Sequence, residues 1–204
     1  IAMKLHRVRP VGAPPPIVRV IDDKTPNAFT TGGGYVYIHT GLIRIMRNEA
    51  ELAMVLGHEM AHGDLNHIRE RGRAAATTSV LGQLAGVVIG QTIGGGLGGA
   101  AANTAAGLAL QAGFTSFSRD QERGADEIGL RYIARSGYDD RAGAQAFGSL
   151  QRASGGRRGG PSWLSTHPLS GERLATLSAL SERTQGGSFI GRDVYQRRAL
   201  SRLR

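Results

Sequence analysis

Three residues in the stretch VLGHEMAHGDLNH, at positions 55–67, have the types and spacing of a catalytic metal site. His58, Glu59 and His62 form the HExxH pattern of a helical zinc site. Residues four apart on an α-helix lie about 40° apart around its axis, so the two histidines point the same way and can bind one ion. Glu59 stands beside that face, where it can act as a general base. A catalytic zinc still needs a third protein ligand.

His67 is the nearest candidate for that ligand, but helix geometry excludes it. Nine residues from His58 correspond to about 900° of rotation, so His67 faces the opposite side of a continuous helix. The metzincin pattern is also excluded, because its glycine and third histidine would fall at Leu65 and Ile68. The chain has no cysteine to close a structural site. We therefore expect the ligand to come from elsewhere and give His67 a structural role.

The segment ERGAD at 122–126 offers that ligand. Glu122 and Asp126 are four apart on a predicted helix, so they share a face. We expect zinc to be held by His58, His62 and Glu122, while Asp126 accepts a hydrogen bond from the free nitrogen of a ligand imidazole. The small glycine and alanine inside ERGAD would let this helix lie close to the first one.

Two capping boxes predict the helices that carry these motifs. Asn48 with Glu51, and Ser118 with Gln121, precede apolar residues at helical spacing. They predict one helix from about residue 49 to 71 and a second that ends near residue 135. Ser170 is the expected cap of a shorter helix. The active-site helix and the glutamate-bearing helix should therefore be separate elements.

A small sheet is predicted before these helices. IVRVID at 17–22 and YVYI at 35–38 are β-branched or aromatic, and the glycines at 32–34 suggest a tight turn or a bulge. Residues 1–16 end in three prolines and read as an extended arm. The fold class predicted is α+β, mainly helical, with a small antiparallel sheet.

Composition supports a single globular domain over residues 1–204, with 40% hydrophobic residues. The net charge of +9 is dispersed and not interleaved with aromatics, so nucleic-acid binding is not expected. Residues 74–118 carry no charge and read as a Gly/Ala-rich helical insertion or loop, with membrane contact through 80–112 as the alternative. Residues 154–166 read as a mobile Gly/Arg loop, and residues 193–204 as a basic tail.

The motif combination resembles a known family. HEMAH at 58–62, ERGAD at 122–126 and THPLSGER at 166–173 are similar to the motifs of the HtpX / CAAX-prenyl-endopeptidase / Oma-type zinc metallopeptidases, above all their soluble bacterial branch. The resemblance implies a gluzincin fold, in which the edge strand of a small sheet binds substrate. It also implies a periplasmic or membrane-associated place in the bacterial envelope, or alternatively the mitochondrial intermembrane space.

The resemblance also assigns residues that spacing alone does not. Asn27 and Ala28 match a segment beside the substrate-binding strand, and His167 and Arg173 match residues that help to bind substrate or stabilise the tetrahedral intermediate. The expected function is a Zn²⁺-dependent endopeptidase that cleaves extended or misfolded polypeptide in envelope quality control, with Glu59 as the base. The alternative is a zinc-containing chaperone or assembly factor with latent proteolysis.

Overall fold

The computed structural model of the chain describes residues 1–74, 77, 116–154, 162–184 and 186–203. Residues 80–112, for which membrane contact is the alternative interpretation, lie outside these ranges, as does most of the predicted insertion at 74–118. Within the described ranges, no helix has both the length and the hydropathy needed to cross a membrane. One compact unit comprises residues 1–66 and 116–204 and contains all the candidate site residues.

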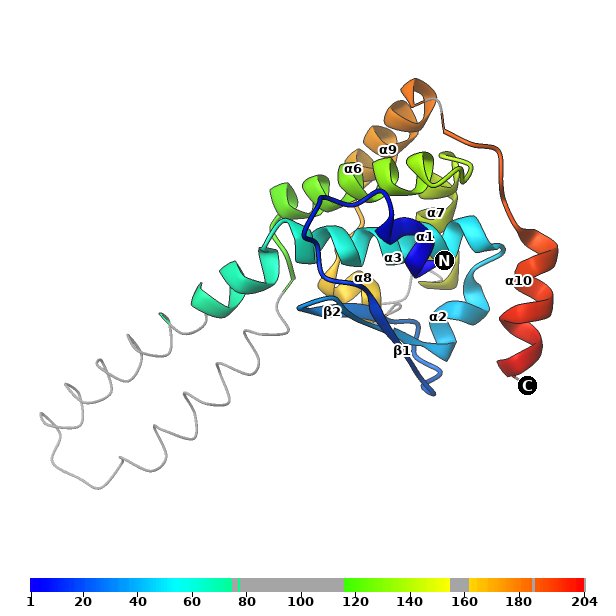
Figure 1. Ribbon diagram of the computed structural model, residues 1–204, viewed down its shortest axis with the longest axis horizontal. Helices are drawn as coiled ribbons and strands as arrows, with labels where there is room; N and C mark the ends of the chain where they lie inside the picture. The colour runs from blue at the N-terminus through cyan, green and yellow to red at the C-terminus, as the bar shows by residue number, and fades with distance from the viewer. Residues whose placement is uncertain (75–76, 78–115, 155–161, 185, 204) are drawn as a thin grey trace, which may run out of the picture. The chain divides into compact units, whose positions relative to one another are not determined.

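Helix α3 (Glu49–Asp64) is the buried centre of this unit (Figure 1). The Asn48 side chain accepts a hydrogen bond from the Glu51 amide, which confirms the predicted cap. Every residue from Ala50 to His62 is buried, so the helix is covered all round rather than along one stripe. It ends earlier than predicted: Asn66 takes a positive φ of 60°, and this interrupts the helix before His67.

Helix α6 (Arg119–Arg135) packs directly on α3. Its first turn has the complete capping box of Ser118 and Gln121, and it ends where predicted. The two helices approach each other closely at Gly129. A Cβ atom on Gly129 would lie 2.9 Å from the His58 backbone nitrogen, and one on Gly57 would lie 3.2 Å from the Gly129 carbonyl oxygen. Two glycines thus set the spacing of the helices that carry the site.

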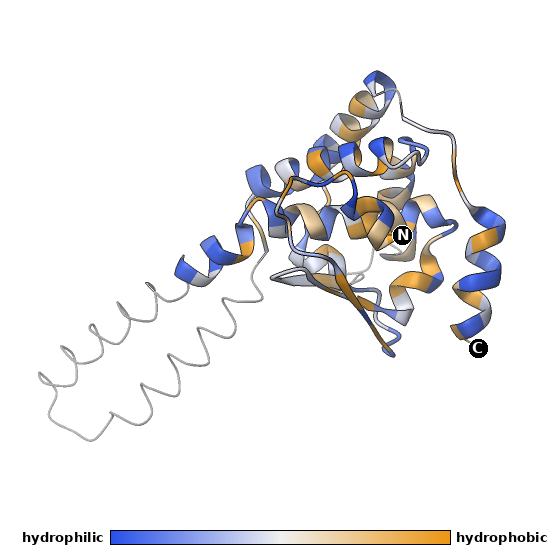
Figure 2. Cartoon of the chain, viewed as in Figure 1, coloured by the Kyte–Doolittle hydropathy of each residue, from blue (hydrophilic) through white to orange (hydrophobic). Residues whose placement is uncertain are grey.

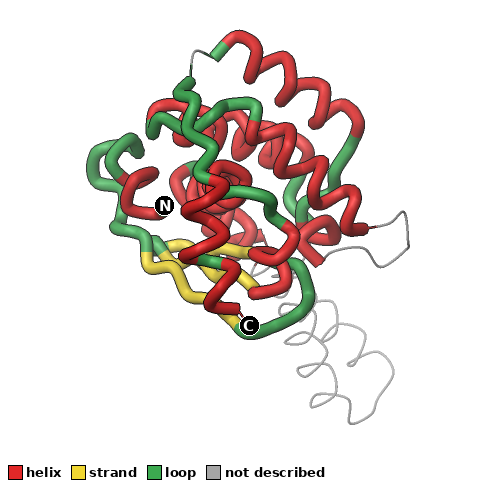
Figure 3. The backbone as a smooth tube through the Cα atoms, turned by 90° about the vertical axis from the view of Figure 1, so that its right-hand side faces the viewer, coloured by secondary structure: helices red, strands yellow, loops and turns green. Residues whose placement is uncertain are grey.

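The sheet has three strands in the order β1–β3–β2, and they gather on one side of the helices (Figure 3). The strands are β1 (Ile17–Ile21), β2 (Ala28–Gly32) and β3 (Tyr35–His39). The β2–β3 hairpin is antiparallel, as predicted, with an irregular register between Thr30 and Gly32. Strand β1 pairs with the other edge of β3 and runs parallel to it, so the sheet is mixed and the prediction of an antiparallel sheet was wrong. Hydrophobic residues run along β1 (Figure 2).

The N-terminal segment is not the extended arm predicted for residues 1–16, because Ala2–His6 form helix α1. Arg9 then anchors the segment: its guanidinium donates two hydrogen bonds to Asp64 at the end of α3, and both side chains are buried. Tyr132 of α6 donates to the same carboxylate. The buried charge of Asp64 is therefore paired and bonded from two sides.

Most of the other named helices pack on α3, on β3 or on one another. Their bounds are α2 (Thr40–Ile45), α7 (Ala142–Ser154), α8 (Ser162–Thr166), α9 (Gly171–Arg183), α10 (Arg192–Arg198) and a short 3₁₀ helix (Leu200–Leu203). Ser170 caps α9 as predicted. Part of the expected Gly/Arg loop at 154–166 is helical, because α8 occupies its last five residues. The expected basic tail at 193–204 is also mainly helical, and Tyr195 fixes α10 by donating to the Ile43 carbonyl.

The close helix approach gives a first prediction. Gly129→Ala should lower the free energy of unfolding by about 1–3 kcal/mol, because the new methyl group would clash with the α3 backbone and force the helices apart. Gly171→Ala is the matched control, since a Cβ there meets nothing within 4 Å. Urea denaturation of both variants measures the difference. Equal stability of the two variants would show that the close approach at Gly129 does not limit the spacing of α3 and α6.

Candidate metal and catalytic site

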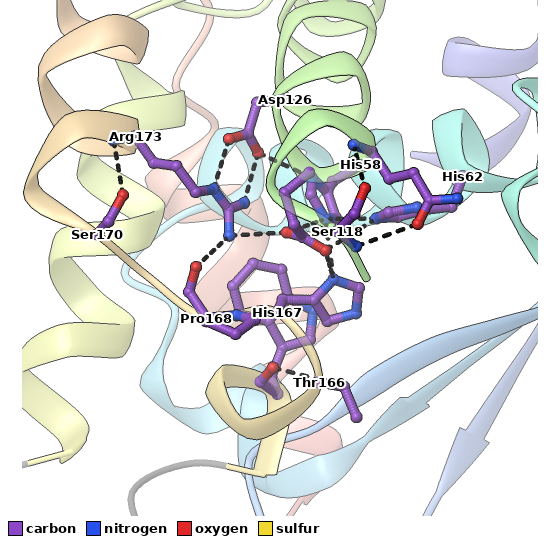
Figure 4. Close-up of polar contacts among 12 residues, drawn as sticks. His58, His62, Ser118, Asp126, Thr166, His167, Pro168, Ser170 and Arg173 are labelled. Carbon is purple, nitrogen blue, oxygen red and sulfur yellow. Dashed lines mark hydrogen bonds and ion pairs between the residues drawn. The ribbon is translucent and has the colours of Figure 1, made fainter. Parts of the chain in front are cut away.

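Four buried side chains meet beside α3: His58 and His62 from α3, Glu122 from α6, and His167, which follows α8. Figure 4 shows the three histidines of this cluster. One potential donor atom from each lies within 4.8 Å of all the others. The Nε2 atoms of His58 and His62 are 3.1 Å apart, as expected for histidines four apart on one helix face. The Glu122 oxygens lie 3.5 Å and 3.4 Å from these two nitrogens. The predicted ligand set is therefore brought together, and His67 is not part of the described cluster.

The donor set fits a divalent metal ion. Two imidazole nitrogens and one carboxylate are the ligands of a catalytic site with an open position. Tetrahedral donors about 2.0–2.1 Å from an ion lie about 3.4 Å from one another, close to the separations found here. His167 brings a fourth candidate donor, since its Nδ1 atom is 3.2 Å from His58 Nε2 and 2.8 Å from Glu122 Oε1. This position makes His167 part of the donor cluster itself.

Asp126 lies behind the cluster, as its spacing from Glu122 predicted. Its Oδ1 atom is 2.9 Å from Nδ1 of His58, on the side of the ring away from the other donors. Such a contact fixes the orientation of a ligand imidazole and increases its basicity. Asp126 is 3% exposed, so this carboxylate needs further partners within the protein.

Arg173 provides them (Figure 4). Its Nε and Nη2 atoms donate to the two oxygens of Asp126, each at 2.8 Å, in a bidentate pair. Its Nη1 atom lies 2.7 Å from Glu122 Oε2 and donates to the Pro168 carbonyl at 2.8 Å. One buried guanidinium therefore neutralises both carboxylates, which come from the same face of α6.

Burial and these partners shift the pKa values of the cluster in different directions. Burial lowers the pKa of His62 to about 2, so its imidazole is neutral. Burial alone would also lower the pKa of His58, but the bond to Asp126 and the nearby carboxylates outweigh it and raise the pKa. Burial would raise the pKa of Glu122, yet hydrogen bonds from His167 and His62 bring it well below its usual range. Glu122 is thus an anion facing a neutral imidazole, both ready to bind a cation.

Glu59 lies next to the cluster and is fully buried. Trp163 Nε1 donates to Glu59 Oε1 at 2.9 Å, and His167 Nε2 lies 3.3 Å from the same oxygen. The other carboxylate oxygen, Oε2, is buried without a hydrogen-bond partner among the described residues. The expected base is therefore held by one oxygen while the other stays free to accept.

The expected substrate-binding residues lie at the start of β2. Ala28 is the first residue of that edge strand and is buried, and Asn27 precedes it. The Asn27 carbonyl accepts a bond from His39 of β3, while its side-chain oxygen is buried and lacks a hydrogen-bond partner within the described chain. The Pro26 carbonyl accepts a bond from the Trp163 amide, so this corner of the sheet is joined to α8.

Two aromatic residues of the site had not been singled out from the sequence. Trp163 stacks on the His167 ring, with 4.6 Å between ring centroids, and Phe117 stacks on His62 at 3.8 Å. The Phe117 amide also donates to the Thr166 carbonyl. No motif marks either residue, and only the position of Trp163 four residues before His167 could have suggested that it shares a helical face.

Comparison with known proteins agrees with this geometry. The sequence profile described as Peptidase family M48 matches residues 3–181. The chain belongs to peptidase family M48. This membership confirms the expected family and makes the chain a metallopeptidase, the enzyme class that HEMAH and ERGAD indicated.

Three relatives show how similar individual proteins are to this chain. The chain is 34% identical over 160 residues to the "Beta-barrel assembly-enhancing protease" of Yersinia pestis. The matched region is 76% of this chain and 32% of that relative. It is 31% identical over 172 residues to the mitochondrial "Metalloendopeptidase OMA1" of Bos taurus, covering 80% and 32%. The corresponding Arabidopsis thaliana protein is 32% identical over 177 residues, covering 87% and 34%. The chain therefore spans about a third of the length of these relatives.

The contact between Asp126 and His58 gives a second prediction. Asp126→Asn should weaken metal affinity by about 10–100-fold, because His58 loses its anionic partner while all the donor atoms remain. Glu122→Ala should lower metal affinity further, since it removes a donor atom. Competition with a chromogenic zinc chelator measures both. Glu172→Gln, in an exposed side chain at the start of α9, is the control. Unchanged affinity in Asp126→Asn would contradict the orienting role.

Proposed function

We propose that this chain is the catalytic unit of a zinc-dependent endopeptidase that cleaves extended or misfolded polypeptide. The observation that carries the proposal is the buried cluster of His58, His62 and Glu122 beside Glu59, in a chain of the M48 family. A neutral imidazole, an anionic carboxylate and a general base with one free oxygen are what metal-assisted peptide hydrolysis requires. The arrangement on α3 and α6 supports a zincin-like, glutamate-completed site.

His58, His62 and Glu122 would hold the ion. When bound, zinc supplies Lewis-acid chemistry, lowering the pKa of water toward about 7 and polarising the scissile carbonyl. Glu59 takes the proton from the attacking water and passes it to the leaving amine. Its burial excludes bulk water from that transfer.

The family resemblance implies that His167 and Arg173 help to bind substrate or stabilise the tetrahedral intermediate. We propose a different role for each. His167 lies among the donors, so its imidazole can hold the developing oxyanion there. The guanidinium of Arg173 is bonded to Asp126, Glu122 and Pro168. We propose that Arg173 acts mainly through the two carboxylates.

Substrate would bind as an added strand on β2. This strand lies at the edge of the sheet, and Ala28, its first residue, and Asn27, just before it, follow the Pro26 carbonyl that accepts from the Trp163 amide. Backbone bonds along an edge strand bind an extended segment with little dependence on its sequence. That mode suits misfolded or unfolded polypeptide.

The relatives' names suggest where such an activity belongs. One is named for enhancing β-barrel assembly and another is named as mitochondrial. We propose a role in protein quality control in the bacterial envelope, at a periplasmic or membrane-associated position, with the mitochondrial location as the alternative.

Glu59→Gln tests the proposal. The variant should bind zinc as the wild type does and cleave casein at least about 1,000-fold more slowly, because it loses proton transfer but keeps every donor. Metal analysis and a fluorescent casein assay measure the two quantities, with Glu172→Gln as control.

Phenanthroline should abolish wild-type cleavage, and added zinc should restore it. Cleavage by Glu59→Gln at the wild-type rate would refute the assignment of the base. A zinc-loaded wild type that suppresses aggregation but cleaves nothing would instead favour the chaperone function.

A further inference from the structure

Trp163 is the only tryptophan of the chain, and its side chain is fully buried in α8. Buried indoles usually find an acceptor for their N–H group. Here the acceptor is Glu59 Oε1, at 2.9 Å. The bond is charge-assisted when Glu59 is ionised, and such bonds are roughly twice as strong as neutral ones.

This bond makes the two oxygens of Glu59 different from each other. Oε1 receives the indole N–H and lies 3.3 Å from His167 Nε2, whereas Oε2 is buried with no hydrogen-bond partner in the described residues. A glutamate side chain has a broad, weakly restricted terminal torsion, so a carboxylate without such a bond can rotate. A general base transfers a proton faster when its carboxylate is already held in the reactive orientation.

The ring of Trp163 is itself held firmly. One stacking partner is His167, at 4.6 Å with an interplanar angle of 20°, and another is Phe147, at 5.4 Å and 26°. The backbone of Trp163 is bonded too: its carbonyl accepts from the His167 amide and the Thr166 hydroxyl, and its amide donates to the Pro26 carbonyl. Because Pro26 stands just before the edge strand β2, one residue joins the substrate side of the site to the base.

We propose that Trp163 is a positioning residue of the peptidase reaction. Its indole N–H fixes Oε1 of Glu59 and thereby reserves Oε2 as the oxygen that takes the proton from water and returns it to the leaving amine. By stacking on the His167 imidazole, its ring holds that imidazole in place beside the other donors. The inference rests on the proposed function, because it requires Glu59 to be the base.

Trp163→Phe tests the role, because it keeps an aromatic ring for stacking and removes the N–H donor. We expect kcat on a peptide substrate to fall by about 10–100-fold, which corresponds to the loss of one hydrogen bond to a charged group. KM should change less than about twofold and zinc content should not change. Tyr195→Phe is the matched control, since it also removes one buried aromatic donor, the bond to the Ile43 carbonyl, away from the site. It should leave kcat unaltered.

A second measurement does not depend on activity or on the folding of Trp163→Phe. The single tryptophan gives a single indole N–H resonance in a ¹H–¹⁵N correlation spectrum. With a carboxylate acceptor this resonance should lie downfield, and Glu59→Ala should move it upfield while Glu172→Gln leaves it in place.

The outcomes distinguish a failure of the positioning role from a failure of the proposed function. If Glu59→Gln is inactive but Trp163→Phe keeps the wild-type kcat, the positioning role is wrong and the proposed function stands. Equal loss of kcat in Trp163→Phe and Tyr195→Phe would reduce the effect to general destabilisation and overturn it. An indole resonance that ignores Glu59→Ala would also overturn it. A Glu59→Gln variant that remains active would remove the proposed function first.

Discussion

The constraint on which the site depends is the burial of several ionisable groups at the contact between α3 and α6. An unpaired buried charge costs several kcal/mol, so each group needs a partner inside the protein. Gly57 and Gly129 bring the helix backbones close enough for side chains of one to reach those of the other. The carboxylates of α6 then meet the imidazoles of α3. The close approach at these glycines therefore helps to bring the cluster together.

The charges come in a chain of pairs that ends at Arg173. Asp126 orients His58, and Glu122 faces both histidines, which leaves two carboxylates buried on one helix face. Without Arg173 these two buried anions would repel each other with no cation between them. The guanidinium, with its planar fork of donors, satisfies both at once, which a lysine could not do with the same geometry. A metal ion added to the cluster would bring further positive charge to the remaining side.

The parts of this arrangement that follow a local rule could be predicted from the sequence. The spacing of His58 and His62, the shared face of Glu122 and Asp126, and the caps at Asn48 and Ser118 all depend on residues within about one turn of helix. The parts that depend on contacts distant in sequence could not. Strand β1 was assigned correctly as a strand, but its parallel pairing depends on which edge of β3 is free. Trp163 belongs to no motif, and its bond to Glu59 joins α8 to α3 across 104 residues of sequence.

Helix α8 and the residue that follows it show why the missed contact matters. Trp163 and His167 are four residues apart, and the His167 amide donates to the Trp163 carbonyl, so the two rings stack as a unit. One ring bonds to Glu59, the proposed base, and the other lies among the candidate metal donors. A shift of this single turn would therefore disturb the proposed proton transfer and the donor cluster together. The Trp163 amide also donates to the Pro26 carbonyl, just before the edge strand β2. The proposed base, the donor cluster and the proposed substrate-binding strand therefore all contact this one turn.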